Sequence, residues 1–329
     1  MKRYIAAFAA LLLVLSLAAC NTSGLEEYKK ASEKTEHITK GRTSGEFSVV
    51  TQFNTKNMTS EEIKKLNYYK DLSGSFDVTY DDDAEKSIFR NYLNMGGMGF
   101  DFSLFIDKDQ VAMKLPVVGK YLKLNEQEMI AATDEENREI ISQETIDNIT
   151  AKWVSLMKEE DVFKGKDIVL TTPDGEVKTT EYVITLNDGQ IKELMKYSVQ
   201  VILKDENLKS LYGEMAEKNS GNEEFKSFDS LIGSFAEDID KYEIENFIFK
   251  AYVDIDGYIV NEKIDLNLKV VNPEDKGLAA ASYSFELKNW DINKDQEFEF
   301  PVLTEENTMR SDEMAEDMPD IMKDLFKEN

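Results

Sequence analysis

The spacing of apolar residues alternates between two periods along this chain, and each change of period marks a new element. Near the start, Leu25, Tyr28 and Ile38 belong to a series that recurs every three or four positions, which is typical of a helix. Ser23 and the glutamate three residues later fit a capping box that begins the helix, and Gly41 can end it. We therefore predict a first helix over about 24–40.

After residue 41 the period becomes two residues, which indicates strands. The alternation is clearest over 100–106, where Phe100, Phe102 and Leu104 are separated by polar residues. Six such stretches follow one another, over about 47–53, 76–80, 86–94, 100–106, 111–115 and 122–124. Because short polar turns join them, they predict an antiparallel meander.

The second half of the chain returns to a helical period and then to strands. Apolar residues that include Trp153 predict a helix within 125–160, and Asn187 or Asp188 can cap another. Pro173-Asp174-Gly175 predicts the turn of a hairpin. The expected elements are the hairpin 168–186, helices to about 239, a strand through 247–249 with a turn at 254–257, and strands over 259–271 and 279–290.

These elements predict an α+β fold, with an open antiparallel sheet of about eleven strands, a half-barrel, wrapped around helices. We expect a signal peptide over 1–19, one half-barrel domain over 20–303 with a helical insert at about 190–239, and an acidic tail over 304–329. Met318-Pro319 suits the start of a short amphipathic helix in that tail. Its apolar face would be formed by Ile321, Met322, Leu325 and Phe326.

The first twenty residues read as a secretory signal. Two basic residues precede an uncharged stretch over 4–19, which is shorter than the roughly 20 residues of a membrane span. The stretch ends at Leu17-Ala18-Ala19-Cys20 with the only cysteine of the chain. This ending resembles the lipobox of bacterial lipoproteins, which implies cleavage between Ala19 and Cys20 and a lipid on the Cys20 thiol. The alternative is an ordinary signal peptide with an incidental cysteine.

Lipidation of Cys20 would place the protein outside the cytoplasm, anchored to the cell membrane by acyl chains. Removing Lys2 and Arg3 with the signal changes the formal net charge from −26 to −28. Such acidity argues against nucleic acid as a partner, because nucleic acid requires a basic face. It also argues against a protein that lies flat on anionic lipid.

The order of elements resembles the LolA/LppX-type half-barrel lipoproteins, and above all uncharacterised Gram-positive members. The stretches that carry the resemblance are Thr179–Leu186 running into a helix, Ile255–Val260, and Phe298-Glu299-Phe300-Pro301 after a strand. The resemblance implies an open sheet around helices with an apolar cavity that holds acyl chains in some members. The long helical insert departs from the family, and its helices could fill that cavity.

No arrangement of residues indicates catalysis. His37 is the only histidine, and we interpret it as a solvated surface residue on the first helix. One histidine and one cysteine cannot form a structural zinc site. Asp254-Ile255-Asp256-Gly257 resembles the beginning of a calcium loop but lacks its distal glutamate, so we predict a hairpin turn. We expect no enzyme activity, no metal and no cofactor.

The candidate ligand site is one alternating face of the meander. The glycine-rich segment 94–99 is interpreted either as a lip over an apolar cavity or as a flexible hairpin turn with core methionines. The candidate ligand-binding residues are Phe76, Val78, Met95, Met98, Phe100, Phe102, Leu104, Val111 and Met113. The leading functional hypothesis is binding of an apolar ligand such as lipid. The alternative is a non-enzymatic module that engages another protein of the cell envelope.

Overall fold

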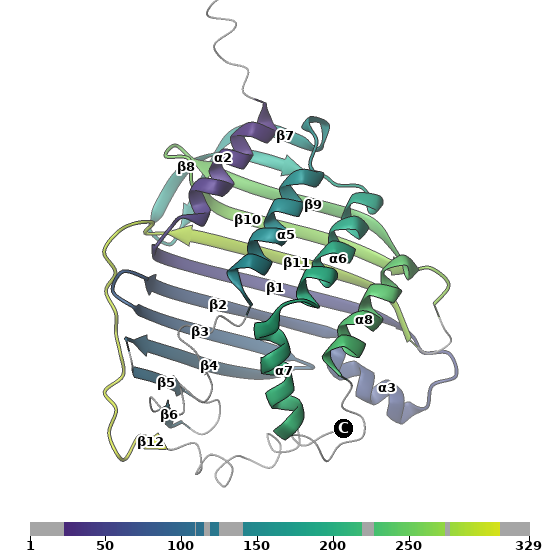
Figure 1. Cartoon of the computed structure of the whole chain (residues 1–329), viewed down its shortest axis with the longest axis horizontal. Helices are drawn as coiled ribbons and strands as arrows, with labels where there is room; N and C mark the ends of the chain where they lie inside the picture. Colours follow the sequence, from purple (N-terminus) through teal and green to yellow (C-terminus); the bar gives the residue numbers. More distant parts are fainter. Residues whose placement is uncertain are drawn as a thin grey trace, which may run out of the picture.

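The computed structural model describes residues 23–108, 110–114, 119–124, 141–218, 227–273 and 277–309. Within these ranges the chain is α+β, with six α-helices and one open sheet of twelve strands (Figure 1). The strand order is β12-β6-β5-β4-β3-β2-β1-β11-β10-β9-β8-β7. All neighbours are antiparallel except the parallel pair of β12 and β6. The predicted fold class and open sheet are confirmed, with one strand more than expected.

The elements follow the predicted order along the chain. The strands are β1 (Lys40–Asn54), β2 (Asp71–Asp81), β3 (Lys86–Met95), β4 (Met98–Asp107), β5 (Gln110–Lys114), β6 (Tyr121–Leu124), β7 (Val162–Thr172), β8 (Gly175–Ile184), β9 (Tyr242–Asp254), β10 (Ile259–Val270), β11 (Gly277–Trp290) and β12 (Thr308–Met309). The helices are α2 (Gly24–Glu36), α3 (Ser60–Leu66), α5 (Gln143–Leu156), α6 (Asp188–Ile202), α7 (Glu206–Lys218) and α8 (Phe228–Asp238).

The first helix is shorter than predicted. The Ser23 side chain accepts a hydrogen bond from the backbone N–H of Glu26 at 3.2 Å, so the predicted start is confirmed. The predicted end at Gly41 is wrong, because β1 has already begun at Lys40. Gly41 pairs with Tyr80 in the neighbouring strand.

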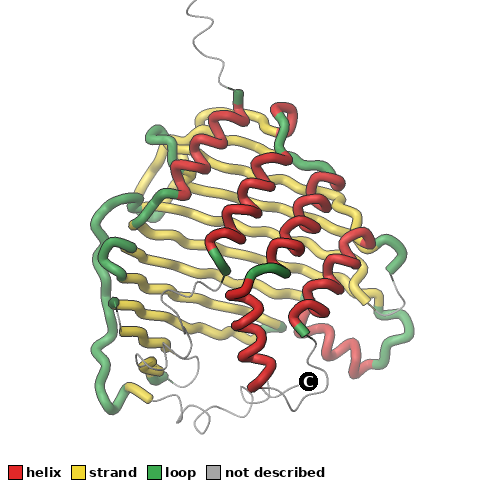
Figure 2. Tube along the Cα trace, viewed as in Figure 1, coloured by secondary structure: helices red, strands yellow, loops and turns green. Residues whose placement is uncertain are grey.

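The helices lie on one face of the sheet. Figure 2 shows α2, α5, α6 and α8 side by side in front of the strands, and α2 packs on β7, β9 and β10 while α6 packs on β9. The rings of Tyr28 and Trp153 contact Phe249 edge-on, with centroids 5.9 and 5.5 Å apart. Ile184 and Ala251 in this cluster have no exposed surface. The main hydrophobic core therefore fills the space between these helices and β7–β11.

The opposite face of the sheet, which we call the outer face, has a small cover of its own. Ile88, Phe105 and Ala112 of β3–β5 point to this face and are buried. The extended segment after β11 packs on them through Phe298 and two neighbours. That segment then reaches β12, which pairs with β6. The sheet thus extends to Met309, beyond the expected domain boundary at 303.

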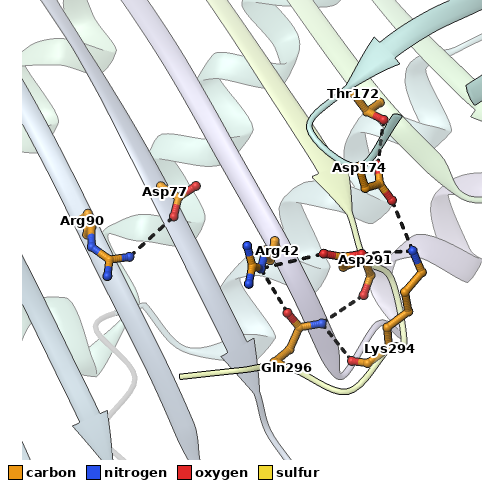
Figure 3. Close-up of polar contacts among 8 residues, drawn as sticks. All are labelled: Arg42, Asp77, Arg90, Thr172, Asp174, Asp291, Lys294 and Gln296. Atoms are coloured by element: carbon orange, nitrogen blue, oxygen red, sulfur yellow. Dashed lines mark hydrogen bonds and ion pairs between the residues drawn. The ribbon is translucent and has the colours of Figure 1, made fainter. Parts of the chain in front are cut away.

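Polar contacts fasten the segment after β11 to the sheet (Figure 3). Lys294 bridges Asp291, at 3.0 Å, and Asp174 in the β7–β8 turn, at 3.3 Å. Burial alone would raise the pKa of Asp174, but hydrogen bonds from Thr172 and Lys294 hold it below its ordinary value. Gln296 accepts a hydrogen bond from Arg42 of β1. These contacts hold the beginning of the segment that covers the outer face.

Two sequence predictions fall outside the described residues: the signal and lipidation segment around Cys20, and the short helix of the C-terminal tail. None of the helices that the structure describes is both long enough and apolar enough to cross a membrane.

Candidate functional site

The sheet register places all nine candidate ligand-binding residues on one face. Phe100 lies opposite Leu93, Leu93 opposite Gly74, and Gly74 opposite Phe47. The same row continues through β11 and β10 to Phe249, which contacts the helices. The other candidates lie on β2–β5 at even spacing from this row, so they share the helix side of the sheet. Nothing in the structure tests their binding role, which stays a prediction.

We name the helix-side positions of β2–β5 the apolar strip. Its members are Leu72, Gly74, Phe76, Val78, Tyr80, Ser87, Phe89, Asn91, Leu93, Met95, Met98, Phe100, Phe102, Leu104, Ile106, Val111 and Met113. None of these positions carries a charge. The charged residues of the same strands all point to the outer face, as Asp77 and Arg90 do in their 3.9 Å ion pair (Figure 3).

The apolar strip is less buried than the core under the helices. Of the nine candidates only Val111 is fully buried, at 8% exposure, and the others are half-buried. By contrast, Ile184 and Ala251 on β8 and β9 are completely covered. The described α-helices make most of their sheet contacts with β7, β9 and β10 rather than with β2–β5. The strip is therefore an apolar sheet surface that the described helices leave partly open.

A ladder of aromatic rings crosses the strip. Centroids are 6.5 Å apart from Phe285 to Phe76, 6.1 Å from Phe76 to Phe89, and 5.7 Å from Phe89 to Phe102. The Phe76 ring lies over Gly45 of β1, where a Cβ atom would overlap it. The missing side chain lets the ring lie flat across the strand. The ladder therefore forms a continuous apolar floor from β11 to β4.

Asn91 places a polar group beside this series of rings. It lies on β3 directly opposite Phe76 and Phe102, two residues from Phe89. Its Oδ1 is shielded from solvent and accepts no hydrogen bond within the described part of the chain. A buried acceptor without a partner costs about 1–3 kcal/mol of folding free energy. A native structure that keeps such a group requires a reason for it.

A second unusual polar group lies on the same face, in the half that the helices cover. Glu262 of β10 has Ala251 and Leu287 as its cross-strand neighbours. Burial of the carboxyl is the cause that raises its pKa from the ordinary value of 4.5 to about 7. Its negative charge in turn contributes to raising the pKa of Tyr28 on α2, after the larger effect of burial. Glu262 is half-buried and lies beside the main core, opposite Ala251, rather than in the apolar strip.

The glycine-rich segment forms a tight hairpin. Gly96 and Gly97 are the two turn residues, with φ of +58° and +84°. Positive φ at both positions matches the twist of antiparallel strands, which explains the two glycines. Met95 and Met98 form the last pair of β3 and β4 and are half-buried. The segment is therefore a hairpin turn, and its role as a lip over a cavity stays a prediction.

The outer face has a polar hollow that sequence reasoning missed. A volume of about 520 Å³ is lined by Ser48, Ser73, Ser75 and Ser284 together with longer side chains such as Tyr92. These residues come from β1, β2, β3 and β11. The hollow arises where short serine side chains meet between long ones, and it lies on the side of the sheet away from the apolar strip.

The remaining candidate chemistry lies apart from both faces. His37 is exposed at the end of α2. The Asp254 carboxylate accepts a hydrogen bond of 2.8 Å from the backbone N–H of Tyr258, and this bond closes a hairpin turn. In the ranges that the structure describes, no group of three His, Cys, Asp or Glu side chains is placed to hold a metal ion.

Comparisons with known proteins identify no family. No family model and no curated protein matches the sequence. Among solved structures, one of lipovitellin on lipid–protein interactions is similar over 80% of this chain, at 10% identity and a TM-score of 0.25, and this chain spans 26% of that chain. A β-barrel-like protein of a domain of unknown function (DUF1849) from Brucella abortus is similar over 77% of this chain and all of its own, at 9% identity and a TM-score of 0.19. These likenesses are too distant to support a functional argument.

Proposed function

We propose that this protein is a non-enzymatic, lipid-anchored lipoprotein of LolA/LppX-like half-barrel type that binds an apolar ligand, such as a lipid acyl chain, outside the cytoplasm. The observation that supports the proposal is the apolar strip. It is an uncharged surface across four strands, half-buried, and not closely packed by the described helices. Partly open apolar surface with aromatic lining is typical of sites for apolar ligands.

Enlarging one side chain of the strip tests the site. Leu104 lies opposite Phe89 and Met113 in the middle of the candidate set. If the strip holds a ligand, Leu104→Trp occupies its place, and we expect binding of a fluorescent lipid to be lost while the melting temperature is unchanged. A filled interior instead resists enlargement, at about 1–3 kcal/mol.

The matched control is Asp101→Trp, at an exposed position of the same strand on the outer face. It adds the same indole and should leave lipid binding intact. A Leu104→Trp variant that binds lipid as well as the parent would contradict the site. A lowered melting temperature in a protein that never bound lipid would contradict the function itself.

Anchoring is tested separately at Cys20. The thiol is the expected site of lipid attachment, and stable anchoring requires acyl chains on the protein. We expect Cys20→Ala to release the protein from membranes or to leave it as an unprocessed precursor. Fractionation and the mass of the mature chain are the measurements. A variant that matures and fractionates with membranes like the parent would exclude the lipid anchor.

A protein-interaction module remains the second candidate, and one observation favours it. β7 is an edge strand of the sheet, and Phe163 and Val169 on it are 68% and 62% exposed. An edge strand with exposed apolar side chains can pair with a strand of another protein. Failure of lipid binding in the experiments above would favour this candidate.

A further inference from the structure

We propose that Asn91 selects the ligand of the apolar strip, and that this ligand is an uncharged lipid with a hydrogen-bond donor, such as the hydroxyl of an acylglycerol or a long-chain alcohol. This inference rests on the proposed function and adds a ligand class to it. The group that carries it is the unpartnered, solvent-shielded Oδ1 of Asn91 within an apolar surface.

The position of Asn91 argues against an incidental polar residue. Its two cross-strand neighbours are Phe76 and Phe102, and Phe89 precedes it by two residues. All three rings belong to the ladder that forms the floor of the strip. A ligand chain that lies along these rings therefore passes the amide. Rotation about the soft terminal torsion of asparagine can turn the oxygen toward such a ligand.

The chemistry of an amide oxygen defines the complementary group. Oδ1 can only accept a hydrogen bond, so the ligand must donate one. A hydroxyl on an otherwise apolar molecule donates to Oδ1 while its chain remains on the phenylalanine rings. An ether or an ester oxygen in the same place has no proton to donate.

The absence of charge excludes an ionised headgroup at this position. None of the strand positions of the apolar strip is charged, so a fatty-acid carboxylate would lose water there without gaining a cationic partner. The net negative charge of the chain also repels anions over longer distances. A neutral hydroxyl requires neither a counter-ion nor a change of protonation.

The test compares three ligands of matched chain length: hexadecanol, 1-methoxyhexadecane and palmitate. Each displaces Nile red, an uncharged fluorescent probe, from the chain that begins at residue 20, at pH 8. Because one net hydrogen bond changes affinity on the order of tenfold, hexadecanol should bind about ten times more tightly than its methyl ether. Palmitate, which is ionised, should bind more weakly than hexadecanol.

Asn91→Leu should abolish the preference for the alcohol by weakening hexadecanol binding alone. The control is Asn94→Leu, which changes the same residue type on the same strand at an outer-face position, and it should keep the preference. Asn91→Ala, which adds no bulk, serves as a second variant. Both Asn91 variants should remain folded at the temperature of the assay, as their melting temperatures will show. Weaker binding of hexadecanol then reports the lost hydrogen bond and not unfolding.

Each contrary outcome has its own meaning. A preference for hexadecanol that persists in both Asn91 variants, or palmitate binding as tight as that of hexadecanol, would overturn the inference. So would equal binding of alcohol and ether by the unchanged protein, although the proposed apolar-ligand function would then stand. If none of the three ligands displaces Nile red, the proposed function itself fails.

Discussion

Glu262→Gln is expected to raise the free energy of unfolding by about 3 kcal/mol near pH 8 and to leave it almost unchanged near pH 4. Burial raises the pKa of this carboxyl from 4.5 to about 7. The folded state therefore holds a proton that the unfolded state has released between these two pH values. The contribution of Glu262 to the free energy of unfolding is therefore fully present below pH 4.5. It is lost as the pH rises through 7.

Thermal or denaturant unfolding of both proteins at several pH values measures this effect. Glutamine keeps the shape of the protonated carboxyl, so the variant should lack the fall in stability that the parent shows from pH 4.5 to 7. A constant difference between parent and variant at every pH would contradict the assignment. It would mean that packing, rather than titration of Glu262, determines the change.

Glu286 provides a matched control, because its pKa is shifted in the opposite direction to that of Glu262. It lies on the neighbouring strand β11 and points to the outer face. Burial alone would raise its pKa, but a hydrogen bond from Asn261 and the charges of Lys263 and Lys288 hold it below its ordinary value. Glu286→Gln should therefore lower stability at neutral pH. That loss should disappear in acid, as the pH falls through the lowered pKa.

The periodicity of the sequence was sufficient to predict most of the sheet. The alternation of Phe100, Phe102 and Leu104 with polar residues places one set on each face, and β4 has that arrangement. Strand order within the meander also followed, because strands that are consecutive along the chain usually lie side by side in the sheet. The pairing of β1 with β11 could not be predicted from the sequence pattern, because paired residues such as Phe47 and Phe285 are far apart in the sequence.

The same long-range pairing explains why the outer-face hollow was missed. Ser48 and Ser75 meet Ser284 only because β11 lies beside β1. Likewise, nothing in the sequence indicated that Phe298 covers the outer face of β3–β5. Its apolar character predicts burial, but the surface that buries it depends on how the chain returns across the sheet.

Two polar residues on the helix side of the sheet were not singled out from the sequence, although the alternating pattern contains both. Glu262 begins the series that continues with Ile264 and Leu266, and Asn91 lies between Phe89 and Leu93. In each case a polar residue occupies a position that the period of two assigns to the apolar face. Such exceptions identify buried polar groups, and here they mark the two positions with the most distinctive chemistry.

The aromatic ladder leads to the other prediction of large effect, which concerns Gly45 and Gly74. A Cβ on Gly45 would meet the Phe76 ring, whereas a Cβ on Gly74 would lie 2.5 Å from the Phe47 ring and 2.7 Å from the Tyr92 carbonyl oxygen. Each Gly→Ala variant should lose about 1–3 kcal/mol of unfolding free energy, as overpacked sites do.

The two sites should differ in how far a second substitution restores stability. Urea titration of the single and double variants measures this difference. Adding Phe76→Leu to Gly45→Ala removes the atoms that the new methyl would meet, so the double variant should lose less than the sum of the two single variants. Phe47→Leu should rescue Gly74→Ala only in part, because the Tyr92 carbonyl belongs to the backbone and stays in place. The control is Gly277→Ala, where a Cβ meets no atom within 4 Å, and it should cost nothing. Additive losses at Gly45 and Phe76 would show that the ring does not lie over the glycine and that the floor of the apolar strip is built differently.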